Sequence, residues 1–136
     1  MFNAFKEEYR RNADRLLTKI NALRLQCNLD MHTNVSFNIN SGFRNPIHNA
    51  KYAPNSQHLT GNAIDIRDVN GSLAMWCLNH INIINNDYNF SMECPLKTNG
   101  WVHLDNRPVR ANPNPIKMLN RTKNAKCNAC NSCPRF

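Results

Sequence analysis

The sequence of 136 residues contains no long apolar run, and this absence excludes some classes of protein. A membrane-spanning helix needs about 20 consecutive apolar residues, and no segment approaches that length. Residues 1–11 are polar and charged, so they lack the basic-then-apolar layout of a secretory signal. We therefore expect a protein without a membrane span that is made in the cytoplasm without a signal peptide.

Acidic residues are absent from the last part of the chain, residues 107–136, which holds seven Lys or Arg. The formal net charge of +8 is therefore concentrated there, and residues 1–106 are close to neutral. A basic segment attracts anionic partners such as nucleic acid, phospholipid or anionic wall polymers, although a solvated tail has the same composition. We expect one domain over residues 1–106 and a basic, extended tail over residues 107–136.

The six cysteines fall into two groups. Scattered cysteines in a reducing compartment are typically small core residues, and three fit this description: Cys27, Cys77 and Cys94. The others form a Cys-x2-Cys-x2-Cys run in the tail: Cys127, Cys130 and Cys133. Three thiolates are one short of a closed zinc or iron–sulfur site. A structural metal site completed by another ligand and a tail with free or variably oxidised thiols both remain open.

Apolar periodicity predicts two helices. Apolar residues recur at three- and four-residue steps through residues 3–26, which indicates a helix that packs one face on the core. Ser72 is a candidate N-cap for a second helix over residues 73–84.

Alternation and turn residues predict short strands between and after these helices. Strands are expected over residues 35–39 and 62–67, and residues 88–94 are expected to pair with residues 101–104. Helices that flank a short antiparallel sheet make an α+β domain.

Two histidines and an aspartate stand out as candidate metal ligands. His58 and Asp65 lie seven residues apart around a predicted strand, and His103 lies on a later one. A catalytic zinc site takes three protein ligands and keeps one position for water, and nitrogen and carboxylate ligands suit that metal. Gly61 and Ala63 keep the nearby volume small, so we expect a substrate backbone to approach there. Spacing alone leaves purely structural histidines as the alternative.

Three ordered motifs resemble one known family. Residues 56–65 read Ser-x-His-x-x-Gly-x-Ala-x-Asp, and residues 101–105 read aromatic-x-His-x-Asp. Residues 41–44, Ser-Gly-Phe-Arg, are similar to a Ser-Gly-Tyr-Arg signature, and Asn49 matches an asparagine that follows it. Together these motifs resemble the zinc D-alanyl-D-alanine carboxypeptidase family, which includes bacterial wall carboxypeptidases and phage endolysins. The resemblance implies a Hedgehog/DD-peptidase-like zinc peptidase fold.

The resemblance also implies a role for individual residues. His58, Asp65 and His103 would bind Zn2+ as the cofactor. Arg44 would polarise the scissile carbonyl or bind a substrate carboxylate, because a guanidinium is always charged and presents a planar fork of donors. Ser56 would either hydrogen-bond the substrate or hold the loop. Peptidoglycan stem peptides would be the substrate, and the reaction would be metal-assisted amide hydrolysis.

The general base is the point at which the resemblance is incomplete. Many family members carry Glu or Asp three residues before the last histidine, where this chain has Gly100, and some carry His two residues before it, where this chain has Trp101. Glu93 is the best remaining candidate, because its predicted strand pairs with the strand of His103. A two-residue turn would place Leu96 there instead, unless a bulge corrects the register.

Asp105 offers a further carboxylate near His103. It is interpreted as a carboxylate that orients His103 or a neighbouring residue.

These patterns predict a zinc metallopeptidase that acts on the bacterial cell wall, as a carboxypeptidase or an endolysin-type endopeptidase. A phage origin is expected, with release at lysis or association with virion proteins. One alternative is a non-catalytic, metal-binding virion structural or wall-binding domain of the same fold. A nucleic-acid-binding protein built on the basic cysteine tail is a weaker alternative, so nucleic acid is not expected as a partner.

Overall fold

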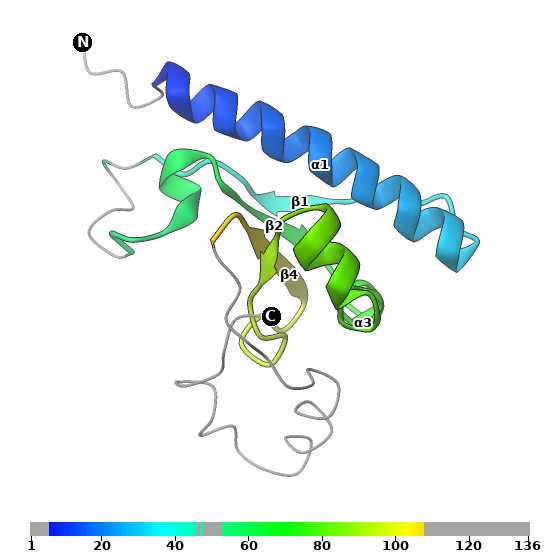
Figure 1. Cartoon of the computed structure of the whole chain (residues 1–136). Helices are drawn as coiled ribbons and strands as arrows, with labels where there is room; N and C mark the ends of the chain where they lie inside the picture. The colour runs from blue at the N-terminus through cyan, green and yellow to red at the C-terminus, as the bar shows by residue number, and fades with distance from the viewer. Residues whose placement is uncertain (1–5, 46, 48–52, 108–136) are drawn as a thin grey trace. The chain divides into compact units, whose positions relative to one another are not determined.

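The computed structural model describes residues 6–45, 47 and 53–107 (Figure 1). The chain divides into two compact units, Met1–Ile66 and Arg67–Phe136. The predictions for Asn49 and for the cysteine tail lie outside the described residues. Among the described residues, no helix combines the length and apolarity that crossing a bilayer requires.

The first unit begins with α1 (Glu7–Met31), which confirms the predicted N-terminal helix and extends it beyond residue 26. The helix ends at His32, which adopts the left-handed conformation with φ of 52°. The side chain of Asn28 then ties the end of the helix to the following loop, because its amide group bonds both the backbone N–H and the carbonyl of Val35. The buried side of α1 consists of Leu16, Ile20, Leu23, Cys27 and Asn28.

The remaining elements of the first unit are short. Strand β1 (Ile39–Ser41) lies further along the chain than the predicted strand over residues 35–39. It pairs antiparallel with β2 (Ala63–Arg67), with Ser41 opposite Asp65 and an irregularity in the register beside it. Between them, the short 3-10 helix η1 (Gln57–Thr60) leads into β2. This pairing places two of the sequence motifs side by side.

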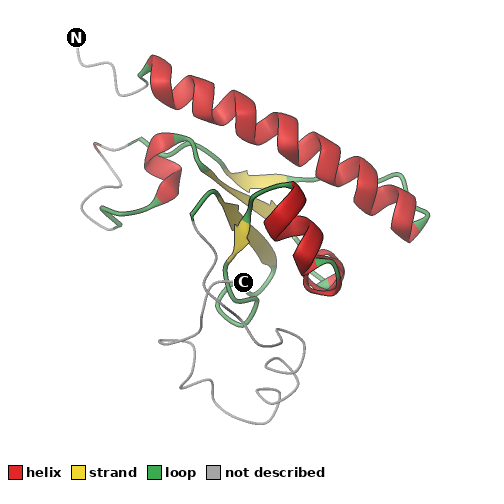
Figure 2. Cartoon of the chain, in the orientation of Figure 1, coloured by secondary structure: helices red, strands yellow, loops and turns green. Residues whose placement is uncertain are grey.

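The second unit contains α3 (Ser72–Asn79) and the π-helical turn η2 (Ile83–Asp87), shown as helix in Figure 2. The prediction that Ser72 is the N-cap is wrong, because Gly71 occupies that position with φ of 74°. Glycine has no side chain to cap the helix. The Asp68 carboxylate instead accepts hydrogen bonds from two N–H groups in the first turn of α3, those of Leu73 and Ala74.

The second unit also contains a hairpin of β3 (Ser91–Met92) and β4 (Trp101–Asp105). The strands are antiparallel, with Ser91 opposite Asp105 and Met92 opposite Leu104. The four strands have the order β1-β2-β4-β3, so helices and a small antiparallel sheet confirm the predicted α+β class. The largest completely buried side chains of this unit include Phe90, Leu78, Ile84, Met92 and Leu104.

Three of the cysteines belong to the core. Cys27, Cys77 and Cys94 are buried, as predicted, and they form no disulfide within the described part of the chain.

Candidate metal centre

The predicted site residues lie in two segments. The loop half is defined here as residues 41–66, and the hairpin half as residues 91–107. Each half brings its own set of predicted residues together through contacts within that half.

His58 in the loop half is oriented by backbone groups. The hydroxyl of Ser56 caps η1 by accepting from the backbone N–H of His58 at 3.3 Å. The imidazole Nδ1 lies 2.6 Å from the carbonyl oxygen of Gly42. A carbonyl can only accept, so Nδ1 carries the proton and Nε2 carries the lone pair of a neutral ring. The buried imidazole therefore presents Nε2 as its ligand atom.

Asp65 and Arg44 form an ion pair beside this histidine. Nη2 of Arg44 donates to Oδ2 of Asp65 at 2.9 Å, and Nε of Arg44 donates to the hydroxyl of Ser41, also at 2.9 Å. The backbone N–H of Arg44 donates to the carbonyl of His58. The Ser-Gly-Phe-Arg motif therefore belongs to the same cluster as the ligand motif, which explains why both occur in one sequence.

Gly61 has a structural role that differs from the expectation. The prediction that small residues here admit a substrate backbone is wrong for this position, because the backbone of α1 occupies the space. A Cβ atom on Gly61 would lie 2.5 Å from the carbonyl oxygen of Tyr9, and its φ of 77° also disfavours other residues. The side chain of Asn12 donates to the Thr60 carbonyl next to it. Gly61 thus lets α1 pack against η1.

His103 in the hairpin half is oriented by a carboxylate. It lies on β4 two residues before Asp105, so both side chains project from the same face of the strand. Nε2 of His103 lies 2.9 Å from Oδ2 of Asp105. The carboxylate accepts a hydrogen bond from Nε2–H, which leaves Nδ1 as the ligand atom of a neutral ring. Asp105 is therefore the residue that contacts His103 on this side of the ring.

Ser91 and Arg107 are residues that sequence reasoning missed. The Ser91 hydroxyl donates to Asp105, and Arg107 donates to it from its backbone and from its guanidinium. Composition assigns Arg107 to the basic tail, whereas its contacts belong to the end of β4. The Asp-x-Arg spacing was a usable signal, because an Asp side chain often accepts a hydrogen bond from the backbone N–H two residues on, as Asp105 does from Arg107.

Glu93 lies opposite His103 across the hairpin. The backbone N–H of Glu93 donates to the carbonyl of His103 at 3.1 Å, which continues the register set by Met92 and Leu104. Opposed residues of an antiparallel pair project to the same side, so Glu93, and not Leu96, shares the face of His103. Its side chain is half-buried and makes no hydrogen bond or ion pair within the described residues.

His58, Asp65 and His103 form the group that could hold a metal ion. All three are buried, and one ligand atom of each lies within 4.8 Å of the other two. Two imidazole nitrogens and a carboxylate oxygen are suitable ligands for zinc. Nε2 of His58 also lies 3.3 Å from Oδ2 of Asp65, and two such electron-rich atoms repel each other unless a cation or proton is shared between them. The donor set therefore fits a divalent metal ion.

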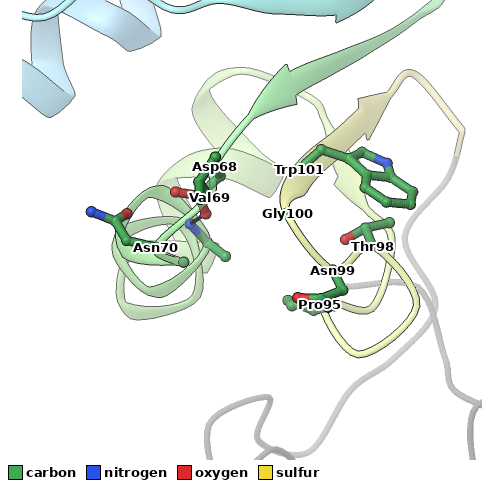
Figure 3. A pocket seen from close by; sticks show the side chains of 10 residues that line it. Asp68, Val69, Asn70, Pro95, Thr98, Asn99, Gly100 and Trp101 are labelled. Atoms are coloured by element: carbon green, nitrogen blue, oxygen red, sulfur yellow. Dashed lines mark hydrogen bonds between the residues drawn. The ribbon is translucent and has the colours of Figure 1, made fainter.

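A pocket of about 180 Å³ lies in the second unit without including any of these three residues. In Figure 3 its two sides are formed by the segments 68–70 and 95–99, and Trp101 lies at its edge. The carboxylate of Asp68 already caps α3, as described above. The hydroxyl of Thr98 is buried without a hydrogen-bond partner among the described residues, and it is closed off from solvent. The pocket therefore adds no candidate ligand to the metal centre.

Comparison with known proteins decides the family. A family model described as Peptidase M15 matches residues 3–105 of the chain. The chain belongs to the peptidase M15 family. This assignment confirms the resemblance to the zinc D-alanyl-D-alanine carboxypeptidases, and M15 membership implies peptidase activity. No curated protein and no solved structure shows a significant match.

Proposed function

We propose that this M15 peptidase is a zinc enzyme that hydrolyses peptide bonds in peptidoglycan, with His58, Asp65 and His103 as the metal ligands. The observation that carries the proposal is the convergence of these three buried side chains, each with a ligand atom within 4.8 Å of the other two. Three protein ligands leave one position for water, as catalytic zinc sites require.

When bound, zinc would lower the pKa of a coordinated water toward about 7 and polarise the scissile carbonyl. Glu93 acts as the general base, which accepts a proton from the attacking water and returns it to the leaving amine. Its position on the His103 face of the hairpin and its uncommitted carboxylate support this role. Glu93 thereby replaces the acid that is missing at Gly100.

Arg44 supplies positive charge next to the carboxylate ligand. Nη2 of its guanidinium forms the ion pair with Asp65, and 37% of the surface of the Arg44 side chain is accessible to solvent. The donors that Asp65 and Ser41 do not use are available to a substrate carbonyl or carboxylate, which a planar fork recognises well. Ser56 contributes indirectly, by holding the loop that carries His58.

We further propose that the enzyme is a phage lytic protein that acts on the wall after release at lysis, or from the virion. The similarity to a family that includes phage endolysins supports this origin. The formal net charge of +8 supports an anionic surface as the place of action.

Digestion of purified peptidoglycan tests the proposal. The full chain would be incubated with it as purified, after chelation, and after chelation followed by added Zn2+, with mass analysis of the released fragments. Hydrolysis that disappears with chelator and returns with zinc is expected, and the fragment masses identify the bond that is cut. A zinc-loaded, folded chain that releases no fragment from peptidoglycan of several bacterial species would contradict the proposal.

The alternative of a non-catalytic member rests on one observation, the glycine at position 100 in place of an acidic residue. It predicts tight zinc binding without hydrolysis. The same digestion therefore separates the two functions.

A further inference from the structure

We infer that Asp105 is a positioning residue, which orients His103 for metal binding and is itself held by Ser91 and Arg107. The inference rests on the proposed function, because it concerns one of the proposed zinc ligands. All four residues lie in the hairpin half, so the inference depends only on contacts within that half.

Asp105 is completely buried, and both of its carboxylate oxygens are engaged. Oδ1 accepts from the hydroxyl of Ser91 at 2.8 Å and from the backbone N–H of Arg107 at 2.9 Å. Oδ2 accepts from Nε and Nη2 of Arg107 at 3.0 and 2.7 Å. A buried carboxylate is costly unless donors of this kind compensate it. With donors on both oxygens, the plane of the carboxylate is fixed.

The fixed carboxylate determines the state of His103. Oδ2 of Asp105 lies 2.9 Å from Nε2 of His103 and can only accept, so the proton of the neutral ring resides on Nε2. The lone pair is therefore on Nδ1, and the orientation of the ring follows from the carboxylate. Carboxylates that hold ligating histidines in this way raise the basicity of the ligand and fix its tautomer.

Arg107 is suited to this task by its shape. Its guanidinium reaches Oδ2 through two nitrogens while its backbone N–H reaches Oδ1, so one residue contacts both oxygens. A lysine ammonium is a point charge and cannot reproduce the two guanidinium bonds. The position of Asp105, and through it that of His103, therefore depends on an arginine at position 107.

Zinc affinity of the full chain tests the inference. The wild type would be compared with Asp105→Asn, Arg107→Lys and Ser91→Ala by competition with a chelating dye. The control is Arg11→Lys, an equally conservative change at an exposed residue of α1. Loss of a residue that positions a ligand typically costs about 10- to 100-fold in metal affinity. We expect that loss for Asp105→Asn, a smaller loss for Arg107→Lys, the smallest for Ser91→Ala, and none for the control.

A second measurement keeps the test informative if the buried Asp105→Asn variant fails to fold. The ¹⁵N chemical shifts of the His103 imidazole in the metal-free wild type report which nitrogen carries the proton. A proton on Nε2 is expected, with a weakened hydrogen bond in the half-exposed Arg107→Lys variant.

The outcomes separate this inference from the proposed function. A wild type that binds no zinc defeats the proposed function, whereas the tautomer of metal-free His103 still decides the inference. A proton on Nδ1 of His103 would overturn it. Zinc affinity that is unchanged in folded Arg107→Lys and Asp105→Asn would overturn it as well.

Discussion

The loop half and the hairpin half each present one histidine, and they orient it by different means. In the loop half a backbone carbonyl, that of Gly42, holds Nδ1 of His58. In the hairpin half a buried carboxylate, that of Asp105, holds Nε2 of His103. The two rings therefore offer different nitrogens as ligand atoms. A neutral acceptor needs no counter-charge, whereas a buried carboxylate does, and Arg107 supplies it.

Each half also contains an Asp–Arg pair, and the two pairs have different roles. Asp65 is bound by Arg44 through a single nitrogen and lies beside Nε2 of His58. Asp105 has donors from its own hairpin on both oxygens. A carboxylate whose lone pairs are already engaged is a poor metal ligand. Asp65 is the acid that we propose as a metal ligand, and Asp105 is the acid that we propose as a positioning residue, although both lie next to an arginine.

The largest expected effect comes from removing the histidine of either half. His58→Ala and His103→Ala are each expected to reduce wall hydrolysis by at least about 1,000-fold, because two protein ligands do not retain catalytic zinc. Fragment release and zinc content would be measured together. His32→Asn is the matched control, because His32 is exposed and asparagine tolerates its left-handed backbone. Zinc-dependent activity that survives either alanine change would show that the histidine of that half is not a required metal ligand.

Glu93→Gln in the hairpin half is expected to separate chemistry from metal binding. Loss of a general base lowers kcat by about 10²- to 10⁴-fold, while zinc affinity stays unchanged because Glu93 is not a ligand. Steady-state kinetics on a wall peptide, together with a zinc titration, would measure both quantities. Glu8→Gln, at an exposed residue of α1, controls for the loss of one charge. An unaltered kcat would remove Glu93 from the mechanism.

Gly61→Ala in the loop half is expected to lower the free energy of unfolding by about 3 kcal/mol, through left-handed strain and overlap with α1. Urea denaturation would measure the change. Gly71→Ala is the matched control, because Gly71 has a similar φ but no atom within 4 Å of the added Cβ. It should cost about 1 kcal/mol, from backbone strain alone. Equal costs at the two sites would show that the contact with Tyr9 is unimportant.

The smallest expected effects come from changes at Arg44 and its partner Ser41, namely Arg44→Lys and Ser41→Ala. Lysine keeps the charge but cannot bond both Ser41 and Asp65, so kcat/KM should fall by about tenfold, the equivalent of one charge-assisted hydrogen bond. Ser41→Ala removes only the contact with Nε and should have a smaller effect. The two variants would be compared in the same peptide assay. A larger loss in Ser41→Ala than in Arg44→Lys would contradict the assigned contacts.

Much of the fold was predictable because its signals are local. The apolar stripe of the first helix needed only helical periodicity. Its end did not follow from that pattern, because His32 and the side-chain bonds of Asn28 terminate the helix. The predicted N-cap of α3 was wrong for a related reason. The carboxylate that caps the helix belongs to Asp68, which lies four residues before Ser72 and outside the usual N-cap position.

The sequence alone determined the family and the candidate ligand set, because His58, Asp65, His103 and Arg44 sit in motifs with characteristic residue types and spacing. Only the tertiary structure decided which contacts each of them makes. The register of the hairpin, which places Glu93 opposite His103, depends on how many residues the turn absorbs. The role of Gly61 depends on α1, about fifty positions earlier in the chain. The chemical type of each side chain and its spacing within a motif can be read from a short stretch of sequence. Strand register and the close approach of two backbone segments depend on residues that meet only after folding.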